Sequence, residues 1–413
     1  MSSNDTFDEK WLTRLDSHLR TEGYSQISRK NYRAEARRFL EYLAKCDIAV
    51  EAVEVCDISR YLRRELRRYC RRHGHPPSSR CDWRNAHASG IHMLLRVAQG
   101  QWPPISNPST ALEVIQQQIC QEYAHWLLTV RGLAAETISR LGEEAERFLT
   151  WLGERGGDQI SQLSVLAIDG YLTSRAVSLC RRSRKTLATS LRSFLHYLHQ
   201  TGRITRDLAA FVVAPKVYAL ETIPSALRAE DVQAVVQTAR RDHSAIGRRD
   251  YAILELLGTY GLRTGEIVNL RLDDVDWRRE TLRIRHTKTG TESYLPLLRS
   301  AGEAILAYLQ TGRPKTSARE IFIRGCAPYQ HLRSVYPLVQ HRFREAGVHP
   351  AGKRGAHVFR HAKAVSLLRA GMSAKQIGDI LGHRSTASTT VYLKLATEDL
   401  RAVALGIPTE MKS

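Results

Sequence analysis

The sequence predicts a mainly α-helical protein of several domains, with one small antiparallel sheet in its last third. Three observations predict this fold. A chain of 413 residues is too long for a single ordinary core, and its 43% of apolar residues can fill two or three cores. Through the first half, apolar residues recur at helical spacing. Residues 281–297 instead alternate apolar and polar positions around a glycine-containing turn, as in a β-hairpin.

Two stretches unsuited to helices divide the chain, GQWPPISNPST at 100–110 and VVAPKVYALETIPSALRAED at 212–231. Proline lacks a backbone donor and resists helix continuation, so both are expected to be linkers. The expected organisation is a helical domain at 1–105, a second at 112–214, a linker at 215–228 and a mixed domain at 229–413.

The first two domains are similar to each other in sequence. GYSQISRKNYRAEARRFLEYL, from Gly23, aligns without gaps on GLAAETISRLGEEAERFLTWL, from Gly132, at a constant offset (132 − 23 = 109). A Tyr-Leu pair at 61–62 recurs at 171–172. Similarity that persists over two helices favours a duplicated small helical domain over a chance likeness of amphipathic helices.

The charge balance favours a nucleic-acid partner. The chain has 62 Lys plus Arg against 42 Asp plus Glu, a net charge of +20. In RYLRRELRRYCRR the arginines recur in pairs every four positions, which a helix gathers onto one face suited to a phosphate backbone. A second cluster begins CRRSRKTLATSLRSFL; a merely solvated face is the alternative for both. The candidate DNA-binding residues are Arg63, Arg64, Arg67, Arg68, Arg71, Arg72, Arg181, Arg182, Arg184 and Lys185.

Cysteine usage and the lack of apolar segments predict a cytoplasmic protein. The seven cysteines are scattered, which favours reduced thiols. No apolar run reaches the roughly 18 residues of a membrane span, and MSSNDTFDEKW lacks a signal-peptide pattern. Cys70, His73, His75 and Cys81 have zinc-binding side chains but match no common zinc module, so a basic loop is favoured and no metal or other cofactor is expected.

The third domain combines polar residues suited to chemistry. Arg263 stands between two apolar helical runs, and Glu266 three residues on is placed to pair with its guanidinium. Lys288 lies at the tip of the predicted hairpin. His357 and Arg360 share one face of a helix that ends at Gly371.

The end of this domain adds a histidine and a tyrosine. Ser373 and Gln376 form a capping box for a short helix that ends at Gly382, next to His383. Tyr392 follows within LGHRSTASTTVYLKL.

These residue types suit phosphodiester chemistry without a metal ion. There is no Gly-Lys-Ser/Thr phosphate loop and no convincing carboxylate set for two magnesium ions. Charge developing on the phosphate must then be met by arginine and histidine donors. A tyrosine is the natural nucleophile, giving a covalent phosphotyrosine, and a lysine can protonate the leaving 5′ oxygen.

Five motifs of the third domain, taken in their order along the chain, resemble the signature of the tyrosine recombinase (phage integrase) family. They are Gly-Leu-Arg-Thr-Gly-Glu, the Lys288 hairpin, His-Val-Phe-Arg-His, Leu-Gly-His and Thr-Thr-Val-Tyr. The resemblance covers roughly the last 190 residues through several independent motifs. It implies a mixed α/β catalytic domain. It also implies that residues 112–214, which precede this domain, form a helical, SAM-like core-binding domain that closes over DNA. The first hundred or so residues depart from the compact two-domain members, and extra DNA grip or a protein contact are both open for them.

The resemblance also implies a role for each motif residue. Arg263 and Arg360 would clamp the scissile phosphate, and Lys288 would be the general acid. The remaining residues have the following implied roles: His357 assists proton transfer, His383 hydrogen-bonds a phosphate oxygen, Tyr392 attacks to leave a 3′-phosphotyrosine, and Glu266 and His361 support the site.

Double-stranded DNA is the implied partner, bound by a homo- or hetero-tetramer on paired sites, with accessory proteins open. LKLATEDLRAVALGI, after the tyrosine, offers an apolar stripe for docking on a neighbouring protomer, or for folding back on its own domain. We expect integration, excision or transposition of a mobile element. The alternatives are relaxation of DNA, as by a type IB topoisomerase, and a non-catalytic DNA-binding relative.

Overall fold

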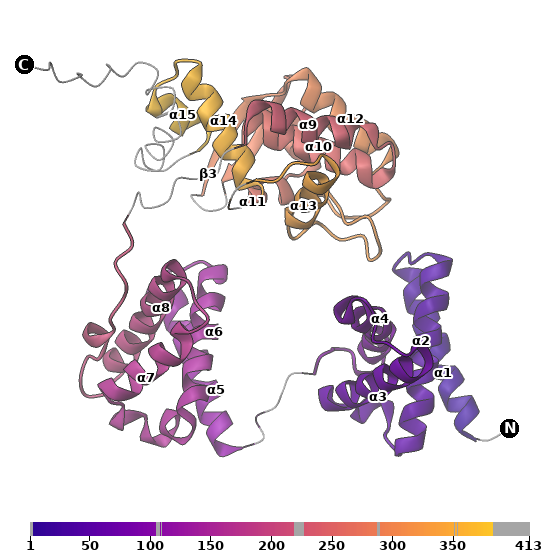
Figure 1. Ribbon diagram of the computed structural model, residues 1–413, viewed down its shortest axis with the longest axis vertical. Coiled ribbons are helices and arrows are strands. Elements are labelled where there is room, and N and C mark those ends of the chain that lie inside the picture. Colours follow the sequence, from indigo (N-terminus) through magenta and orange to yellow (C-terminus); the bar gives the residue numbers. More distant parts are fainter. Residues whose placement is uncertain are drawn as a thin grey trace, which may run out of the picture. The chain divides into compact units, whose positions relative to one another are not determined.

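The computed structural model describes residues 3–104, 108, 110–218, 227–286, 290–350, 352 and 354–382. Within these ranges no helix has the length and apolar character needed to cross a membrane. The chain divides into two compact units, Met1–Pro104 together with Ile223–Ser413, and Ile105–Thr222. Three large hydrophobic cores lie within residues 11–102, 119–212 and 227–359, and Figure 1 shows the helices that surround each of them. A small apolar cluster is formed by Ala364, Ile377 and Leu381.

The first core belongs to a bundle of four helices. They are α1 (Ser3–Thr21), α2 (Gln26–Cys46), α3 (Val55–His73) and α4 (Arg80–Gln99), with a short 3-10 turn at Val50–Ala52. The hydroxyl of Ser25 caps α2 by accepting a hydrogen bond from the Ser28 amide at 3.2 Å, as expected for a residue at the start of a helix. The buried faces of α1, α2 and α4 pack on one another around Leu15, Phe39 and Leu94.

The second core belongs to another bundle of four helices. They are α5 (Ala111–Thr129), α6 (Ala135–Leu152), α7 (Val165–Ala176) and α8 (Arg181–Gln200), with 3-10 turns at Gly153–Gly156, Asp158–Gln162 and Ala209–Phe211. The apolar stripe in the sequence from Thr137 is the buried face of α6, including Phe148 and Leu149. The helical prediction is therefore confirmed for the described parts of both amino-terminal segments.

The two bundles repeat one aromatic arrangement. In the first, Phe39 and Tyr61 meet edge to face with ring centroids 5.1 Å apart. In the second, Phe148 and Tyr171 do the same at 5.0 Å. Both bundles also share the order of their helices and the pairs of helices that pack together, the first on the second and the second on the fourth.

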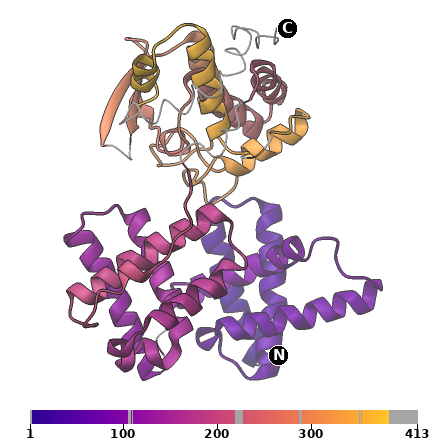
Figure 2. The ribbon, with the colours of Figure 1, turned by 60° about the vertical axis from the view of Figure 1, so that its left-hand side comes forward.

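The third domain consists of helices and a small sheet, and one face of the sheet contributes to its core. The helices are α9 (Ala229–Arg241), α10 (Ala245–Tyr260), α11 (Thr264–Val268), α12 (Arg299–Thr311), α13 (Tyr336–Glu345), α14 (His357–Arg369) and α15 (Ala374–Ile380), with a 3-10 turn at Leu272–Asp274. The strands β1 (Val275–Asp276), β2 (Thr281–His286) and β3 (Thr291–Pro296) form a three-stranded antiparallel sheet in that order. Figure 2 shows this sheet at an edge of the helical body of the domain.

The predicted hairpin is confirmed as β2 and β3. Leu282 pairs with Leu295 and His286 with Thr291, so the described strands leave residues 287–290 between them. The inward positions of β2 are Leu282, Ile284 and His286, each no more than 5% exposed. Asp274 holds β2 from its outward side, because its Oδ1 accepts hydrogen bonds from Arg283 Nε at 2.9 Å and from Arg285 Nη2 at 2.6 Å.

A buried ion cluster ties α13 to α10. Arg342 is 2% exposed and donates to Asp250 Oδ2 at 3.1 Å and to Asp242 Oδ2 at 2.7 Å. Hydrogen bonds from Ser244 and Arg342 lower the pKa of the Asp242 carboxyl to about 2. Such pairs are costly to break, because removing one partner leaves a buried charge uncompensated.

Candidate active site

Arg263 stands where α10 gives way to α11. Gly261 ends α10 with a φ of 66°, a left-handed conformation that glycine adopts without strain, and the chain turns there so that Arg263 precedes the first turn of α11. Glu266 holds Arg263 twice: its Oε2 accepts from the Arg263 amide at 2.8 Å and its Oε1 from Nη1 at 2.7 Å. The expected pairing of this arginine and glutamate is confirmed.

Arg360 lies one turn into α14 and is 3% exposed. Its Nη1 donates to the Gly261 carbonyl at 2.9 Å, and its Nη2 donates to the Leu381 carbonyl. The Arg263 Nη2 donates to the next carbonyl, that of Gly382, at 2.9 Å. Two arginines that are far apart in sequence are thus brought to consecutive carbonyls at the end of α15.

One carboxylate and one amine lie beside the two arginines, Glu266 buried and Lys363 half-buried. Burial alone would raise the pKa of the Glu266 carboxyl, but hydrogen bonds from the Arg263 amide, His286 and the Arg263 guanidinium outweigh it and lower that pKa. Burial lowers the pKa of the Lys363 amine on α14, whose side-chain carbons pack against Gly261. The described part of the site therefore combines two guanidinium groups and a half-buried amine with one buried carboxylate.

His357 and His361 lie on the same helix as Arg360. His357 is the first residue of α14, and its ring stacks on that of His361 with centroids 6.2 Å apart. The structure thus brings Arg263, Arg360 and Glu266 together, and places both histidines on the helix that positions Arg360. Lys288, His383 and Tyr392, the other predicted catalytic residues, lie outside the described residues, as does the apolar stripe predicted from Leu395 onward.

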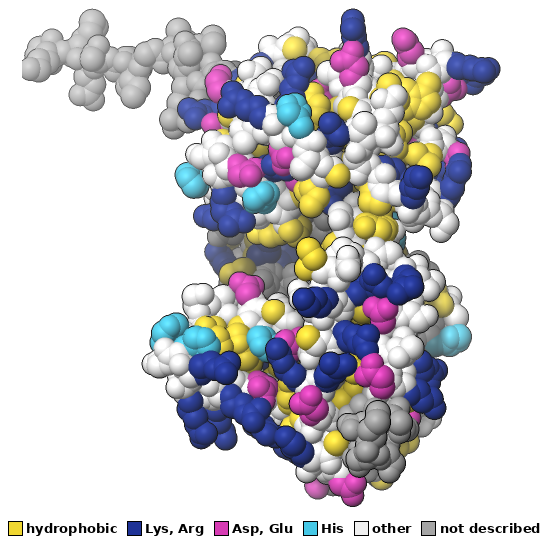
Figure 3. Space-filling view, turned by 90° about the vertical axis from the view of Figure 1, so that its right-hand side faces the viewer, with side chains coloured by type: hydrophobic (Ala, Val, Ile, Leu, Met, Phe, Trp, Pro, Cys, Tyr) yellow, Lys and Arg dark blue, Asp and Glu magenta, His cyan; other side chains and the backbone are white. Residues whose placement is uncertain are grey.

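The predicted DNA-binding arginines of the first bundle lie on α3. Arg63, Arg67, Arg68, Arg71 and Arg72 are exposed, and Arg64 is half-buried with its guanidinium 5.3 Å from the centre of the Tyr42 ring. Arg68 pairs with Glu65 at 2.9 Å. Figure 3 shows one face of the molecule, on which dark blue Lys and Arg side chains are spread widely.

The predicted DNA-binding residues of the second bundle lie at the start of α8. Arg181, Arg182, Arg184 and Lys185 are all exposed. The Arg184 Nε donates to the Leu179 carbonyl at 2.9 Å, which holds this side chain against the first turn of the helix. Exposed cations on a helix surface are available to a polyanion such as a phosphate backbone.

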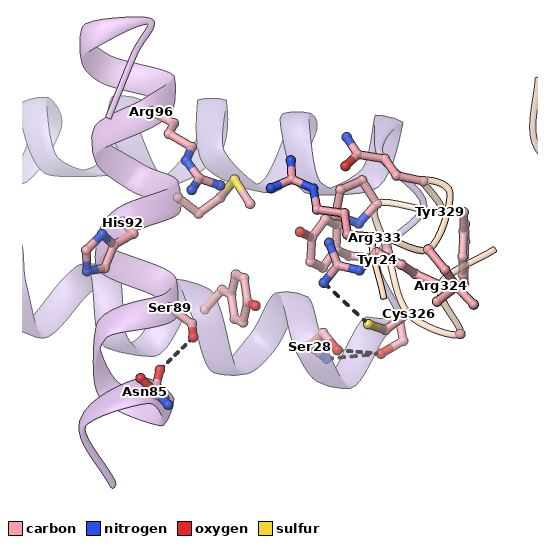
Figure 4. Close-up of a pocket in the computed structure, with 18 of the residues that line it drawn as sticks. Tyr24, Ser28, Asn85, Ser89, His92, Arg96, Arg324, Cys326, Tyr329 and Arg333 are labelled. Atoms are coloured by element: carbon pink, nitrogen blue, oxygen red, sulfur yellow. Dashed lines mark hydrogen bonds between the residues drawn. The ribbon is translucent and has the colours of Figure 1, made fainter. Parts of the chain in front are cut away.

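Helix α4 of the first bundle carries Arg96 and His92. Figure 4 shows Ser89, His92 and Arg96 along this helix, with the Ser89 hydroxyl donating to the Asn85 carbonyl at 2.6 Å. His92 accepts a hydrogen bond from Trp102 Nε1 at 2.8 Å, and burial lowers the pKa of its imidazole. His92 is therefore used in fixing the residues that follow α4.

The cysteine and histidine cluster has ordinary local contacts. His73 stacks on Tyr69 with ring centroids 4.1 Å apart, and its Nδ1 lies 3.0 Å from the Tyr69 carbonyl. The His75 Nδ1 lies 2.9 Å from the Pro76 carbonyl. Among the described residues no group of three or more His, Cys, Asp or Glu side chains is placed to hold a metal ion.

Sequence reasoning missed His286. This residue is buried beside Glu266, with its Nδ1 2.7 Å from the Glu266 Oε1. A signal was present in the sequence, because His286 continues the inward phase of Leu282 and Ile284, and a polar residue in the buried phase of a strand needs a partner.

Comparison with known proteins assigns the family. The model of the phage integrase family matches residues 225–399. A protein of Sinorhizobium fredii named as an integrase/recombinase, y4rF, is 30% identical over 96% of this chain and 91% of its own length. A second such protein of that organism, y4gC, is 58% identical over 45% of this chain and 97% of its own length.

Further similarities agree with this assignment. The tyrosine recombinase XerC of Bacillus pumilus is 28% identical over 69% of this chain and 94% of its own. The crystal structure of the XerH site-specific recombinase bound to difH substrate shares the fold, with a TM-score of 0.54 and 14% identity over 84% of this chain and 96% of that one. The chain belongs to the phage integrase family of tyrosine recombinases, the enzymes that break and rejoin DNA strands.

Proposed function

We propose that this protein is a site-specific DNA recombinase that cuts and rejoins strands through a covalent 3′-phosphotyrosine at Tyr392. The supporting observation is the convergence of Arg263 and Arg360 on the carbonyls of Leu381 and Gly382. His383 is the next residue in the chain and Tyr392 follows nine residues later (392 − 383 = 9), so the carbonyls that the two arginines bind and the proposed nucleophile belong to one short stretch of sequence.

Each candidate residue has a proposed task in the reaction. Arg263 and Arg360 bind the non-bridging oxygens of the scissile phosphate, since guanidinium N–H groups match phosphate geometry. Tyr392 attacks phosphorus, and Lys288 gives a proton to the leaving 5′ oxygen. The other roles are support of Tyr392 proton transfer by His357, a hydrogen bond from His383 to a phosphate oxygen, and positioning by Glu266 and His361.

We further propose that both helical bundles grip DNA. The bundle at 112–214 acts as the core-binding domain, and the one at 1–105 is a duplicate of it, a proposal supported by the Phe39–Tyr61 and Phe148–Tyr171 ring pairs. The linker at 215–228 joins them to a catalytic domain at 229–413. Exposed arginines on α3 and α8 contact phosphates.

The proposed role is the integration, excision or transposition of a mobile element. The proposed active form is a tetramer on paired DNA sites, in the cytoplasm. The S. fredii relatives named as integrase/recombinases support this role. A crystal structure of a lambda integrase tetramer bound to a Holliday junction, with a TM-score of 0.52 over 78% of this chain, supports an assembly of the same kind.

Covalent capture tests the function. The full chain is mixed with a pool of nicked duplexes of random sequence, in which a cleaved strand end diffuses away and traps the enzyme on DNA. The wild type should become covalently attached in the presence of a chelator, and sequencing of the trapped strands gives the site. Tyr392→Phe should abolish capture. If the wild type lost capture when EDTA was added, that result would contradict the proposed metal-independent chemistry.

A second assay separates recombination from relaxation. With the captured site on two plasmids, a recombinase exchanges strands between them, whereas a topoisomerase IB-like enzyme only removes supercoils. A non-catalytic relative would bind the site and show no attachment. Exchange products are expected for the wild type and none for Tyr392→Phe.

A further inference from the structure

We infer that His286 is a positioning residue that joins the arginine clamp to the hairpin of Lys288, an inference that rests on the proposed recombinase chemistry. His286 is the last residue of β2 and is 5% exposed. In the sequence it stands two residues before Lys288. It is not one of the residues that the family motifs in this chain pick out.

The imidazole bridges two elements. Its Nδ1 lies 2.7 Å from the Glu266 Oε1 in α11, and its Nε2 lies 2.8 Å from the Ser293 hydroxyl in β3. An ionised carboxylate only accepts hydrogen bonds, so Nδ1 donates to Glu266, whereas the Ser293 hydroxyl can serve either role. One ring thereby fixes both strands of the hairpin against the start of α11.

Glu266 passes this constraint to the clamp. The same Oε1 that faces His286 accepts from the Arg263 Nη1 at 2.7 Å, and the carboxylate is buried. A buried carboxylate with fixed partners has few alternative rotamers, so the guanidinium that it holds has a defined direction. A change at His286 therefore reaches Arg263 through one shared oxygen.

Gly382 contacts both His286 and Arg263. A Cβ at this position would lie 2.4 Å from the His286 Cε1, so the backbone passes directly over the ring, and Gly382 has a φ of 62°. The Gly382 carbonyl in turn accepts from Arg263 Nη2 at 2.9 Å. Arg263, Glu266, His286 and Gly382 thus fix one another in a ring of contacts that ends at the residue before His383.

The choice of histidine follows from its position. The two preceding inward positions of β2 hold Leu282 and Ile284, and a third apolar residue would pack equally well there. Leucine would, however, leave the buried Glu266 oxygen and the Ser293 hydroxyl each without the imidazole partner, a costly arrangement. A histidine here is explained by what its two nitrogens hold in place.

The test compares two leaving groups on the captured site. One nicked duplex has the ordinary 5′ oxygen at the scissile phosphate, and the other has sulfur in the same bridging position. A thiolate leaves without being protonated, so a defect in the delivery of a proton by Lys288 is relieved by sulfur, whereas a general loss of folded enzyme is not. Lys288→Ala calibrates the relief that loss of the acid itself produces.

We expect His286→Leu to slow covalent attachment on the oxygen substrate by about 100-fold, with DNA affinity changed by less than about threefold. On the sulfur substrate the defect should shrink by about tenfold or more. His286→Gln, which keeps two hydrogen-bonding groups, should recover part of the oxygen rate. The matched control is His341→Ala, an exposed histidine on α13 whose loss should change neither rate.

Two results would overturn the inference. The first is an equal defect of His286→Leu on the two substrates while Lys288→Ala is relieved by sulfur. The second is strict additivity of His286→Leu and Glu266→Gln in attachment rate, because residues that act through a shared oxygen must couple. If His286→Leu melts well below the wild type, His286→Gln is used for both comparisons.

Failure of the proposed function has a different signature. In that case the wild type attaches to neither substrate and Lys288→Ala is indistinguishable from it. A wild type that attaches, with His286 variants that attach equally fast, would leave the recombinase proposal standing and reject the role of His286.

Discussion

The two helical bundles have similar cores of their own and differ on their surfaces. Each has four main helices in the same order, and each packs a phenylalanine of its second helix on a tyrosine of its third, at 5.1 Å in one and 5.0 Å in the other. The third helix itself differs, because α3 has 19 residues and α7 has 12. The additional length of α3 holds arginines, so the same internal packing supports a more basic outer face in the first bundle.

The polar contacts around the phenylalanine–tyrosine pair also differ between the two bundles. In the second bundle the Tyr171 hydroxyl donates to the buried Glu144, which also accepts from Arg147 and Arg175. In the first bundle Glu35, at the matching position (144 − 35 = 109), accepts from Arg38 at 2.7 Å, and its second oxygen has no hydrogen-bond partner among the described residues. The comparison shows that apolar packing is retained where a polar network has changed.

The similarity of the two cores can be tested with matched truncations. Phe39→Ala and Phe148→Ala should each destabilise their own bundle by about 3–5 kcal/mol, since both rings are fully buried. Hydrogen exchange of the full chain, followed on peptides from each bundle, measures the two losses separately. A cost below about 1 kcal/mol for one of them would show that the two cores are not equivalent.

Alkaline pH should weaken the second bundle through Tyr123 on α5. Burial raises the pKa of its hydroxyl to about 12 from the ordinary value of 10.0. A raised pKa gives stability that is complete below pH 10, because only the unfolded chain ionises readily, and that is lost as the pH rises toward about 12. The loss is about 2–3 kcal/mol at most. Denaturant unfolding at pH 8 and pH 11 should show less difference in Tyr123→Phe than in wild type; an equal difference would contradict this role.

The basic surface of α3 should contribute to DNA affinity. Replacing Arg63, Arg67 and Arg71 by alanine removes exposed cations from one face and should weaken binding about 10- to 30-fold near physiological salt. The slope of log K against log salt should fall by roughly 0.9 for each phosphate that the variant no longer neutralises. Alanine at Arg278, Arg279 and Arg299, exposed arginines of the catalytic domain, is the control, and a triple α3 variant that matches this control would favour a protein partner for the first bundle.

The smallest expected effect concerns the tyrosine hydroxyls. Tyr171→Phe removes a hydrogen bond to a buried carboxylate and should cost about 1 kcal/mol, whereas Tyr61→Phe should cost less than about 0.5 kcal/mol. Thermal unfolding of the two variants gives the comparison. Equal costs would mean that Glu144 gains its stability from Arg147 and Arg175 alone.

Local patterns predicted much of the fold. The Ser373–Gln376 capping box is present, with the Gln376 amide donating to the Ser373 hydroxyl at 3.3 Å and the Gln376 Oε1 accepting from the Ser373 amide at 2.8 Å. The alternating residues at 281–286 and 291–296 pair as the two strands of the expected hairpin. These features depend on neighbours a few residues apart, which a sequence displays directly.

The candidate site was predicted less completely. The Arg263–Glu266 pair follows from a spacing of three residues, but the acceptors of Arg263 and Arg360 at Gly382 and Gly261 are 119 and 99 residues away. Those acceptors are main-chain carbonyls, which every residue has, so no side-chain pattern marks them. The place of His286 likewise depends on a tertiary contact between β2 and α11.

Main-chain acceptors have a consequence for engineering this enzyme. A library that randomises Leu381 would alter the packing of a small apolar cluster with Ala364 and Ile377, yet every member would still present a carbonyl to Arg360. Substitutions at Leu381 therefore change this packing without removing the carbonyl that accepts from Arg360. Gly382 offers no such freedom, because any larger residue would collide with the imidazole beneath it.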